Sequence, residues 1–244
     1  MGPTQIVPRL LYRDALLLVI DKPAGVAVHA GPGGGPSLTP SLDSLRFGLP
    51  RRPEVAHRLD KDTSGCLALG RHRQALARLG RLFFANRVEK TYWAVVVGGP
   101  DADEGAIDLP LAPRSPDPAS WLMKADPAGQ PALTHWRVLG RSDGLAWLEL
   151  KPVTGRTHQL RVHCAERGWP ILGDGIYGEK RTGGLRLHLH ARSLLIPLYP
   201  KKPPIAVEAP PPEHIRERLA RDFPDALHSA DGGERNRVDF PRRR

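Results

Sequence analysis

The 244-residue sequence has few cysteines and no long apolar run. Its apolar stretches, of which residues 15–20 are an example, are far shorter than the roughly 20 residues that a transmembrane helix needs. Cys66 and Cys164 are too few for a disulfide framework and lack the paired spacing of a zinc site. The N-terminus also lacks the basic and apolar regions of a secretory signal. We therefore expect a cytoplasmic protein without disulfides.

Acidic residues are scarce relative to basic ones. The sequence has 36 Lys and Arg against 26 Asp and Glu, for a net charge of +10. This balance favours a polyanionic partner, with nucleic acid as the leading candidate, because neutralising phosphates releases counterions. A compositional bias toward Arg, Ala, Pro and Gly would give the same excess. Residues 71–92 concentrate it, with six basic side chains and one acid, although a solvated helix face would have the same pattern.

The order of predicted elements indicates an α+β fold with a mixed, mainly antiparallel sheet and flanking helices. Strands occur in hairpins rather than in regular alternation with helices, which argues against a parallel doubly wound sheet. We predict one catalytic domain over residues 1–200. Residues 201–244 form a Pro-rich C-terminal extension with a short helix near 213–222 and a flexible tail.

Hydrophobic periodicity and turn residues place the individual elements. The predicted strands cover residues 16–20, 26–29, 92–97, 133–139, 145–151 and 184–195. The last of these alternates in polarity, as a half-buried strand does. The predicted helices cover residues 74–84 and 157–167, with Thr157 as the N-cap of the second. Residues 98–128 read as a long connection, and the glycine-rich residues 31–36 as a flexible loop that lacks the Lys-Ser/Thr ending of a P-loop.

Asp60 is the first candidate for chemistry. It lies between Arg58 and Lys61, and nearby positive charges keep a carboxylate ionised, as a nucleophile or an electrostatic stabiliser requires. Alternatively, this aspartate only caps a turn. A metal site at His188 and His190 is not favoured, since the sequence near them offers no third ligand.

Residues 155–163 form a second candidate segment, rich in hydrogen-bond donors at the start of a predicted helix. Arg161 lies one turn into this helix and could hold a catalytic carboxylate through a bidentate pair. The alternative is a surface arginine in a solvated ion pair, worth about 0–1 kcal/mol.

Several separated motifs, taken in order, resemble the RluA-type pseudouridine synthases of the RsuA/RluA superfamily. They are Leu18 to Gly25 with Val28-His29, His57-Arg58-Leu59-Asp60 with Thr63-Ser64-Gly65, Lys90-Thr91-Tyr92, Gly155 to His163, and Pro170 to Asp174 with Tyr177-Gly178. The resemblance covers roughly residues 11–200. Many relatives carry an S4-type RNA-binding domain ahead of the catalytic one. Here the opening strand follows Met1 closely, so a compact form lacking that domain is expected.

The resemblance implies an RNA-modifying isomerase. Such an enzyme breaks the N-glycosidic bond of a uridine, turns the base and rejoins it through carbon, here in tRNA and/or 23S rRNA. It implies that Asp60 is the essential carboxylate, that the Tyr92 ring packs on the target base and that Arg161 pairs with the aspartate. The candidates for contacts with the RNA backbone are Arg58, Lys90 and Arg156. No metal or other cofactor is implied, and we expect a monomer with no required protein partner and no membrane association.

Two other functions fit the same residues. One is a catalytically silent RNA-binding protein on this scaffold, which would be expected to have lost at least one of the three catalytic residues. The other is a nucleoside or glycoside hydrolase that uses Asp60 and Asp62, whose side chains share one face in an extended segment. A hydrolase releases free uracil, whereas isomerisation leaves the mass of the RNA unchanged.

Overall fold

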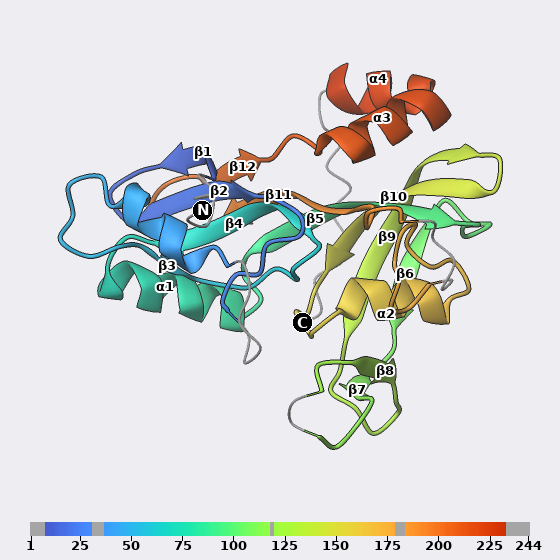
Figure 1. The fold of residues 1–244 in the computed structure, drawn as a ribbon, viewed down its shortest axis with the longest axis horizontal. Coiled ribbons are helices and arrows are strands. Elements are labelled where there is room, and N and C mark those ends of the chain that lie inside the picture. Colours follow the sequence, from blue (N-terminus) through green and yellow to red (C-terminus); the bar gives the residue numbers. More distant parts are fainter. Residues whose placement is uncertain (1–7, 31–36, 118–119, 179–183, 233–244) are drawn as a thin grey trace.

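The computed structural model describes residues 8–30, 37–117, 120–178 and 184–232. Figure 1 shows one broad sheet with helices on both sides. The elements in chain order are β1 (Arg9–Arg13), β2 (Leu17–Lys22), the 3₁₀ helix η1 (Thr39–Leu45), β3 (Glu54–Val55), β4 (Ser64–Gly70), α1 (Arg73–Phe84), β5 (Glu89–Val97), β6 (Glu104–Asp108), β7 (Leu111–Pro113), β8 (Met123–Ala125), β9 (Leu133–Ser142), β10 (Leu145–Pro152), α2 (Gln159–Glu166), β11 (Leu189–Ile196), β12 (Ile205–Glu208), α3 (Glu213–Asp222) and α4 (Pro224–Gly232).

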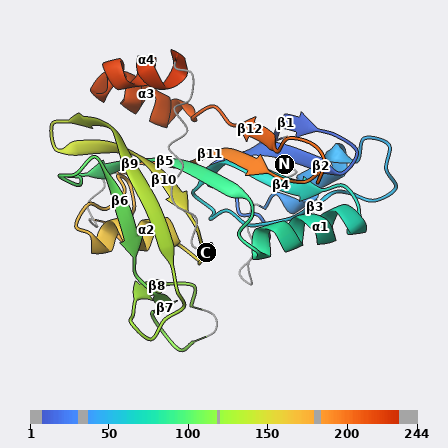
Figure 2. The same cartoon turned by 180° about the vertical axis from the view of Figure 1, so that it is seen from behind.

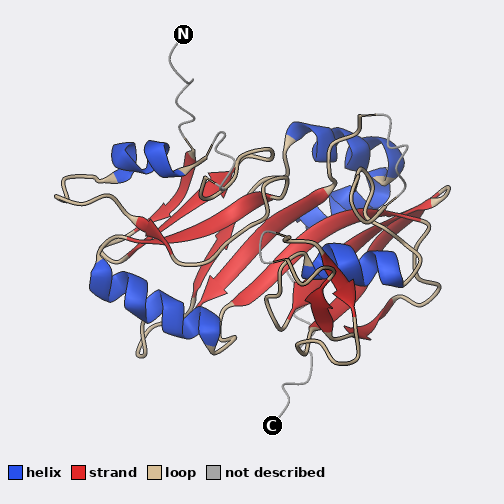
Figure 3. Cartoon of the chain, turned by 60° about the horizontal axis from the view of Figure 1, so that its bottom comes forward, coloured by secondary structure: helices blue, strands red, loops and turns tan. Residues whose placement is uncertain are grey.

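The strands form a ten-stranded mixed sheet, which confirms the predicted α+β class. Its main path runs β1-β2-β4-β11-β5-β10-β9-β6, while β3 pairs with β4 and β12 with β11. Among the pairings of the described residues, β4 with β11 is parallel and the others are antiparallel. Figure 3 shows the strands of this sheet side by side across the molecule. The other two strands, β7 and β8, pair with each other in a separate sheet. The strand β11 joins the half that contains β1, β2 and β4 to the half that begins with β5.

Alternation along β5 gives the two faces of the sheet different partners. Tyr92, Ala94 and Val96 pack in the cluster that contains α2. Trp93 and Val95 pack in the cluster that contains α3. Successive side chains of a strand point to opposite faces, so α2 and α3 cover opposite sides of the sheet. The two cartoon views agree, with α1 and α2 below the sheet and α3 and α4 above it (Figures 1 and 2).

Several elements match the predicted ones. Both α1 and α3 cover the predicted helices, and the β9–β10 hairpin turns at Gly144, whose φ is +66°. Residues 98–128 form a long connection, and its described part contains the short strands β6, β7 and β8. Residues 205–232, assigned to the C-terminal extension, add β12 to the sheet and place α3 against Trp93 and Trp147. The helix α4 was not predicted.

Two predicted strands are wrong or incomplete. Residues 26–29 form no strand, and Ala27 makes only an isolated bridge to Ser37. The predicted strand 184–195 begins only at Leu189, and it is not half-buried. His188 and His190 are buried together with Leu189, because a central strand has both faces covered. The predicted loop 31–36 and the tail beyond residue 232 lie outside the described residues.

The junction between the two halves of the sheet depends on Gly65. The parallel pairing of β4 with β11 consists of two residue pairs, His190 with Ser64 and Ala191 with Gly65. Gly65 has a φ of +110°, and a Cβ atom there would collide with the backbone of Ala191. Beside it, the buried Ser64 hydroxyl donates to Nδ1 of His190 at 2.9 Å, while Nε2 of the same ring donates to the carbonyl of Ala209 at 3.1 Å. This histidine therefore ties β4 to the segment that follows β12.

We expect Gly65→Ala to lower the free energy of unfolding by at least about 3 kcal/mol, because backbone atoms must move apart at the junction. Gly144→Ala is the matched control. Gly144 also has positive φ but has no atom near its missing Cβ, so only the backbone cost of roughly 1 kcal/mol applies. Urea unfolding followed by circular dichroism measures both. Equal losses in the two variants would show that the close approach to Ala191 has no effect.

Candidate active site

A cavity of about 690 Å³ opens on the α2 side of the sheet. All six residues proposed for catalysis or binding line it: Asp60, Tyr92, Arg161, Arg58, Lys90 and Arg156. Its charged lining consists of four cations and the single carboxylate of Asp60, so the net formal charge is +3. The walls come from the segment before β4, from α1, from β5 and from the start of α2. The cavity therefore lies where the two halves of the sheet meet, and its charge suits an anionic ligand.

The segment that carries Asp60 is anchored at both ends. At its start, Nε2 of His57 accepts the N–H of Ala68 at 3.0 Å, and its ring stacks on Phe83 with centroids 4.3 Å apart. Burial, together with the charge of Lys90, lowers the pKa of His57 to about 3, so the ring is neutral at pH 7. A neutral Nε2 acceptor keeps this end of the segment on β4.

At the other end, the ammonium of Lys22 anchors the segment through hydrogen bonds. This lysine is fully buried, and its Nζ donates to the carbonyl oxygens of Pro23, Val26 and Lys61 at 2.8, 2.8 and 3.0 Å. Burial lowers its pKa to about 8, against the opposing effect of the nearby aspartates. Gly25 adds a backbone hydrogen bond to Lys61 at 2.9 Å. Asp60 itself is partly buried, with 17% of its side chain exposed.

The start of α2 differs from the prediction. Thr157 is not the N-cap. His158 occupies that position in the left-handed region, with a φ of +53° and no side-chain cap. The carbonyl oxygen of the Gln159 side chain accepts the N–H of Arg156 at 3.0 Å and the Thr154 hydroxyl at 2.8 Å, while its amide donates to β9. Because Gln159 satisfies this turn, a hydroxyl cap at residue 157 is not required.

Arg161 pairs with a different carboxylate from the one expected. Its Nε and Nη2 donate to Asp174 at 2.8 and 2.7 Å, and both side chains are almost fully buried. The expected bidentate pair with Asp60 is therefore wrong in this structure, although the charge of Asp60 still favours the protonated guanidinium. Asp174 also accepts the backbone N–H groups of Ile176 and Tyr177. These hydrogen bonds already orient its carboxylate, which makes it the better bidentate partner.

His158, rather than Arg161, is the basic residue whose side chain lies beside Asp60. Its Nε2 lies 3.8 Å from Oδ2 of Asp60, and its Nδ1 lies 2.8 Å from the hydroxyl of Tyr177. Burial lowers the pKa of His158 despite the opposing charge of Asp60. The ring is therefore a neutral imidazole near neutral pH.

Tyr92 and Lys90 lie on neighbouring positions of the same face of β5. Burial raises the pKa of Tyr92, and the charge of Asp60 raises it further, so its hydroxyl stays protonated. Burial also lowers the pKa of Lys90 to about 8. Its Nζ donates to the carbonyl of Thr154 at 3.2 Å. This face of β5 thus presents to one ligand an aromatic ring and a positive charge that depends on pH.

The two cysteines take no part in the cavity. Both are buried, and burial raises the pKa of Cys66 to about 12 and also raises that of Cys164. Neither thiol is activated as a nucleophile. His188 and His190 instead bond to backbone or hydroxyl groups.

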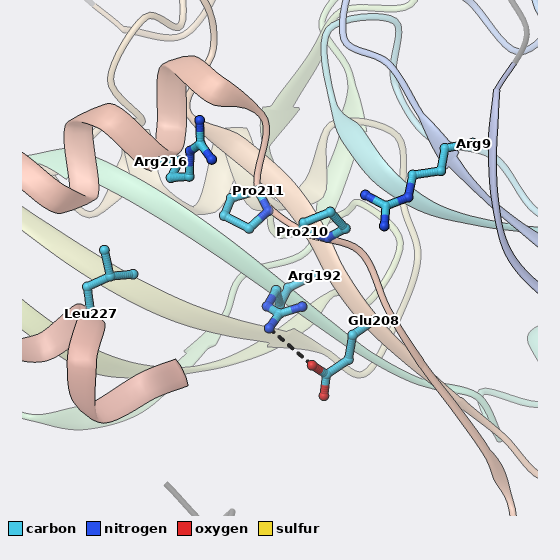
Figure 4. A pocket seen from close by; sticks show the side chains of 7 residues that line it. All are labelled: Arg9, Arg192, Glu208, Pro210, Pro211, Arg216 and Leu227. Atoms are coloured by element: carbon cyan, nitrogen blue, oxygen red, sulfur yellow. Dashed lines mark ion pairs between the residues drawn. The ribbon is translucent and has the colours of Figure 1, made fainter. Parts of the chain in front are cut away.

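A second cavity, of about 450 Å³, lies on the opposite face of the sheet (Figure 4). It is lined by Arg9, Arg192, Glu208, Pro210, Pro211, Arg216 and Leu227. Arg192 pairs with Glu208 at 3.0 Å and lies over the ring of Trp93, so its charge is used to join β12 to β11. None of the six proposed site residues lines this cavity, and we assign the chemistry to the larger one.

Several residues that shape the site had no predicted role. Lys22, His158, Gln159, Asp174 and Tyr177 all lie within the motifs that carried the resemblance. Lys22 ends β2 directly after Asp21, so no local pattern indicated that this lysine is buried. The other four contact residues that a linear pattern does not connect.

The chain is similar to known proteins over most of its length. The model of the RNA pseudouridylate synthase family matches residues 16–166. The chain is 45% identical to an uncharacterised RNA pseudouridine synthase of Zymomonas mobilis, over 85% of this chain and 95% of that one. It is 34% identical to ribosomal large subunit pseudouridine synthase C of Vibrio cholerae, over 87% and 68%. The solved human RNA pseudouridylate synthase domain containing 4 has a TM-score of 0.74 at 29% identity, over 87% and 92%.

In the part of the chain that the structure describes, every helix is too short or too polar to cross a bilayer.

We expect Lys22→Met to lower the free energy of unfolding by about 3 kcal/mol, because three carbonyl oxygens, one of them in a fully buried hydrogen bond, lose their donor. Lys61→Met is the control, since the Lys61 side chain is exposed and its backbone carbonyl is unchanged. Urea denaturation at pH 7 measures both. A Lys22→Met protein as stable as the wild type would contradict the anchoring role of this ammonium.

Proposed function

Because the chain belongs to the RNA pseudouridylate synthase family, we propose that Asp60 is the essential carboxylate of its uridine isomerisation. The observation that carries this proposal is the cavity, in which Asp60 is the only carboxylate among lining residues that include four cations. The enzyme is an isomerase, and its reaction breaks a C–N bond to the sugar and forms a C–C bond. An ionised carboxylate can act on the ribose, on the uracil ring or as a base toward the sugar.

Tyr92 and Arg161 support this carboxylate in different ways. Tyr92 is proposed to pack its ring on the target base and, because its hydroxyl stays protonated, to take part in a proton transfer. Arg161 is proposed to act through the field of its buried guanidinium, which offsets the charge of Asp60, while its pair with Asp174 fixes its position. Leu160 supplies an apolar wall.

The substrate is proposed to be a uridine in tRNA and/or 23S rRNA. A uridine stacked in RNA must be turned out of its helix or loop before its glycosidic bond can be reached. The cavity has the required features: basic side chains around a ring and an apolar wall. The name of the Vibrio cholerae relative refers to the large ribosomal subunit, which favours 23S rRNA as the first RNA to test.

The RNA backbone is proposed to contact Arg58, Lys90 and Arg156 at the rim of the cavity. Arg58 is exposed, and Nε of Arg156 already donates to the carbonyl of Pro131 at 3.1 Å, so its guanidinium is held in place. Phe84, at the end of α1, lines the same cavity with 91% of its surface exposed. An exposed ring beside basic groups is a stacking surface for an unpaired base.

The competing functions can be distinguished by their products. A silent RNA-binding protein forms no pseudouridine, and a hydrolase releases uracil. Asp62, the second carboxylate of the hydrolytic alternative, is exposed and does not line the cavity. A cytoplasmic location, a monomeric state and the boundary at residue 200 stay predictions.

We expect Asp60→Asn to abolish pseudouridine formation while the Kd for RNA stays within about threefold, because an amide keeps the shape but loses the negative charge. Unmodified total tRNA and 23S rRNA are incubated separately with each protein, and pseudouridines are mapped by carbodiimide labelling and primer extension. Retained turnover in the variant would exclude Asp60 as the essential carboxylate. Free uracil from the wild type would favour the hydrolase.

RNA affinity should fall as the pH rises from 7 to 9.5, because Lys90, with its pKa near 8, loses its charge over this interval. Lys90→Arg should keep the affinity and flatten the profile, since an arginine stays protonated. Fluorescence anisotropy at fixed salt measures the Kd, with Asp60→Asn as the background to prevent turnover. If the proteins with lysine and with arginine at position 90 give identical pH profiles, Lys90 is not the titrating contact.

A further inference from the structure

We propose that His158 is a positioning residue for Asp60, held by Tyr177 with its proton on Nε2 so that it donates to the carboxylate. This inference rests on the proposed role of Asp60. His158 lies at the start of α2, where it lines the cavity and is 7% exposed. Its Nε2 and Oδ2 of Asp60 are 3.8 Å apart, a separation that a small rotation of either side chain closes when substrate binds.

The hydrogen bonds of Tyr177 set the tautomer. The backbone N–H of Met123 donates to the Tyr177 hydroxyl oxygen at 2.9 Å. The hydroxyl keeps its own proton, which it can donate to Nδ1 of His158 at 2.8 Å. With Nδ1 as the acceptor, a neutral imidazole carries its proton on Nε2, the atom that faces Asp60. The opposite tautomer would direct a lone pair at the carboxylate.

Aromatic side chains fix the orientation of the ring. Trp121 packs edge-on against it with centroids 5.0 Å apart, and Tyr177 does so at 5.4 Å. Tyr177 is itself held by the guanidinium of Arg161, 5.3 Å from its ring centre, and by its backbone N–H to Asp174. The charged groups that face the imidazole are Asp60, Arg161, Asp174 and Arg58. The ring therefore links the buried Arg161–Asp174 pair to Asp60.

The backbone at this position argues for a use of the side chain. His158 has φ +53° and ψ +17°, the left-handed region, which glycine adopts freely and which Asn, Asp and His adopt more often than other residues do. Such conformations persist where the surrounding structure over-determines them, and they cluster at functional sites. The left-handed backbone fits a histidine, and it places the imidazole with its Nε2 3.8 Å from Asp60.

Two variants separate a positioning role from a role in the turn. In His158→Gln, the amide nitrogen lies near the place of Nε2 and can still donate to Asp60. In His158→Asn, the shorter side chain suits the left-handed backbone but does not reach Asp60. A role limited to the turn predicts that asparagine is the better substitute. The positioning role predicts the reverse order for catalysis.

We expect His158→Asn to lower kcat by roughly 10- to 100-fold, the range for losing one hydrogen bond to a charged group, with KM within about twofold of the wild type. His158→Gln should recover most of kcat. Tyr177→Phe should also lower kcat with KM little changed, since it frees both tautomers. Each is assayed on the RNA in which the wild type forms pseudouridine, and thermal unfolding followed by circular dichroism reports on folding.

The outcomes are distinguishable from those that test Asp60. An inactive Asp60→Asn protein together with His158→Asn at the wild-type kcat, or with asparagine equal to or better than glutamine, overturns the inference about His158 alone. A fully active Asp60→Asn protein overturns the proposed function instead. Losses of kcat that follow the order of thermal stability among the three variants would assign His158 to the turn.

Discussion

The two-residue parallel contact between β4 and β11 is the constraint on which the site depends. It joins a half-sheet that carries the Asp60 segment to a half-sheet that carries Tyr92 and α2. Gly65 permits the contact because no side chain separates the two backbones. The catalytic groups therefore come from two parts of the sheet that this junction joins, and side chains of both parts, such as Leu59 and Tyr92, pack together in one core cluster beside it.

Both burial and ion pairing determine how the charged side chains around the cavity are held. Arg161 forms its ion pair with Asp174, which does not line the cavity, and Lys22 donates to carbonyl groups rather than to a carboxylate. Asp60 is thus left without a direct cationic partner in the described structure, beside a neutral imidazole. A carboxylate that is not held in an ion pair is free to act as a nucleophile or a base.

Local signals predicted the helices α1 and α3 and the β9–β10 hairpin, because apolar periodicity and a glycine turn act over a few residues. The six proposed site residues were found from separated motifs, and the fold brings them to one cavity. The partner of Arg161 was not predictable, since Asp174 lies 13 residues away and its orientation depends on the turn at Ile176 and Tyr177. The burial of β11 on both faces depends on neighbours from distant parts of the chain.

The position of β11 in the sheet has a consequence for how the chain assembles. This strand pairs with β4, β5 and β12, yet it is synthesised after β1 to β10. Until residue 196 has left the ribosome, the residues of β4 and β5 that pair with β11 lack this partner, and pairings of such large sequence separation form slowly. We expect the two half-sheets to form first as separate units, with open strand edges that are prone to aggregation. Folding during synthesis would then be limited by the arrival of its central strand.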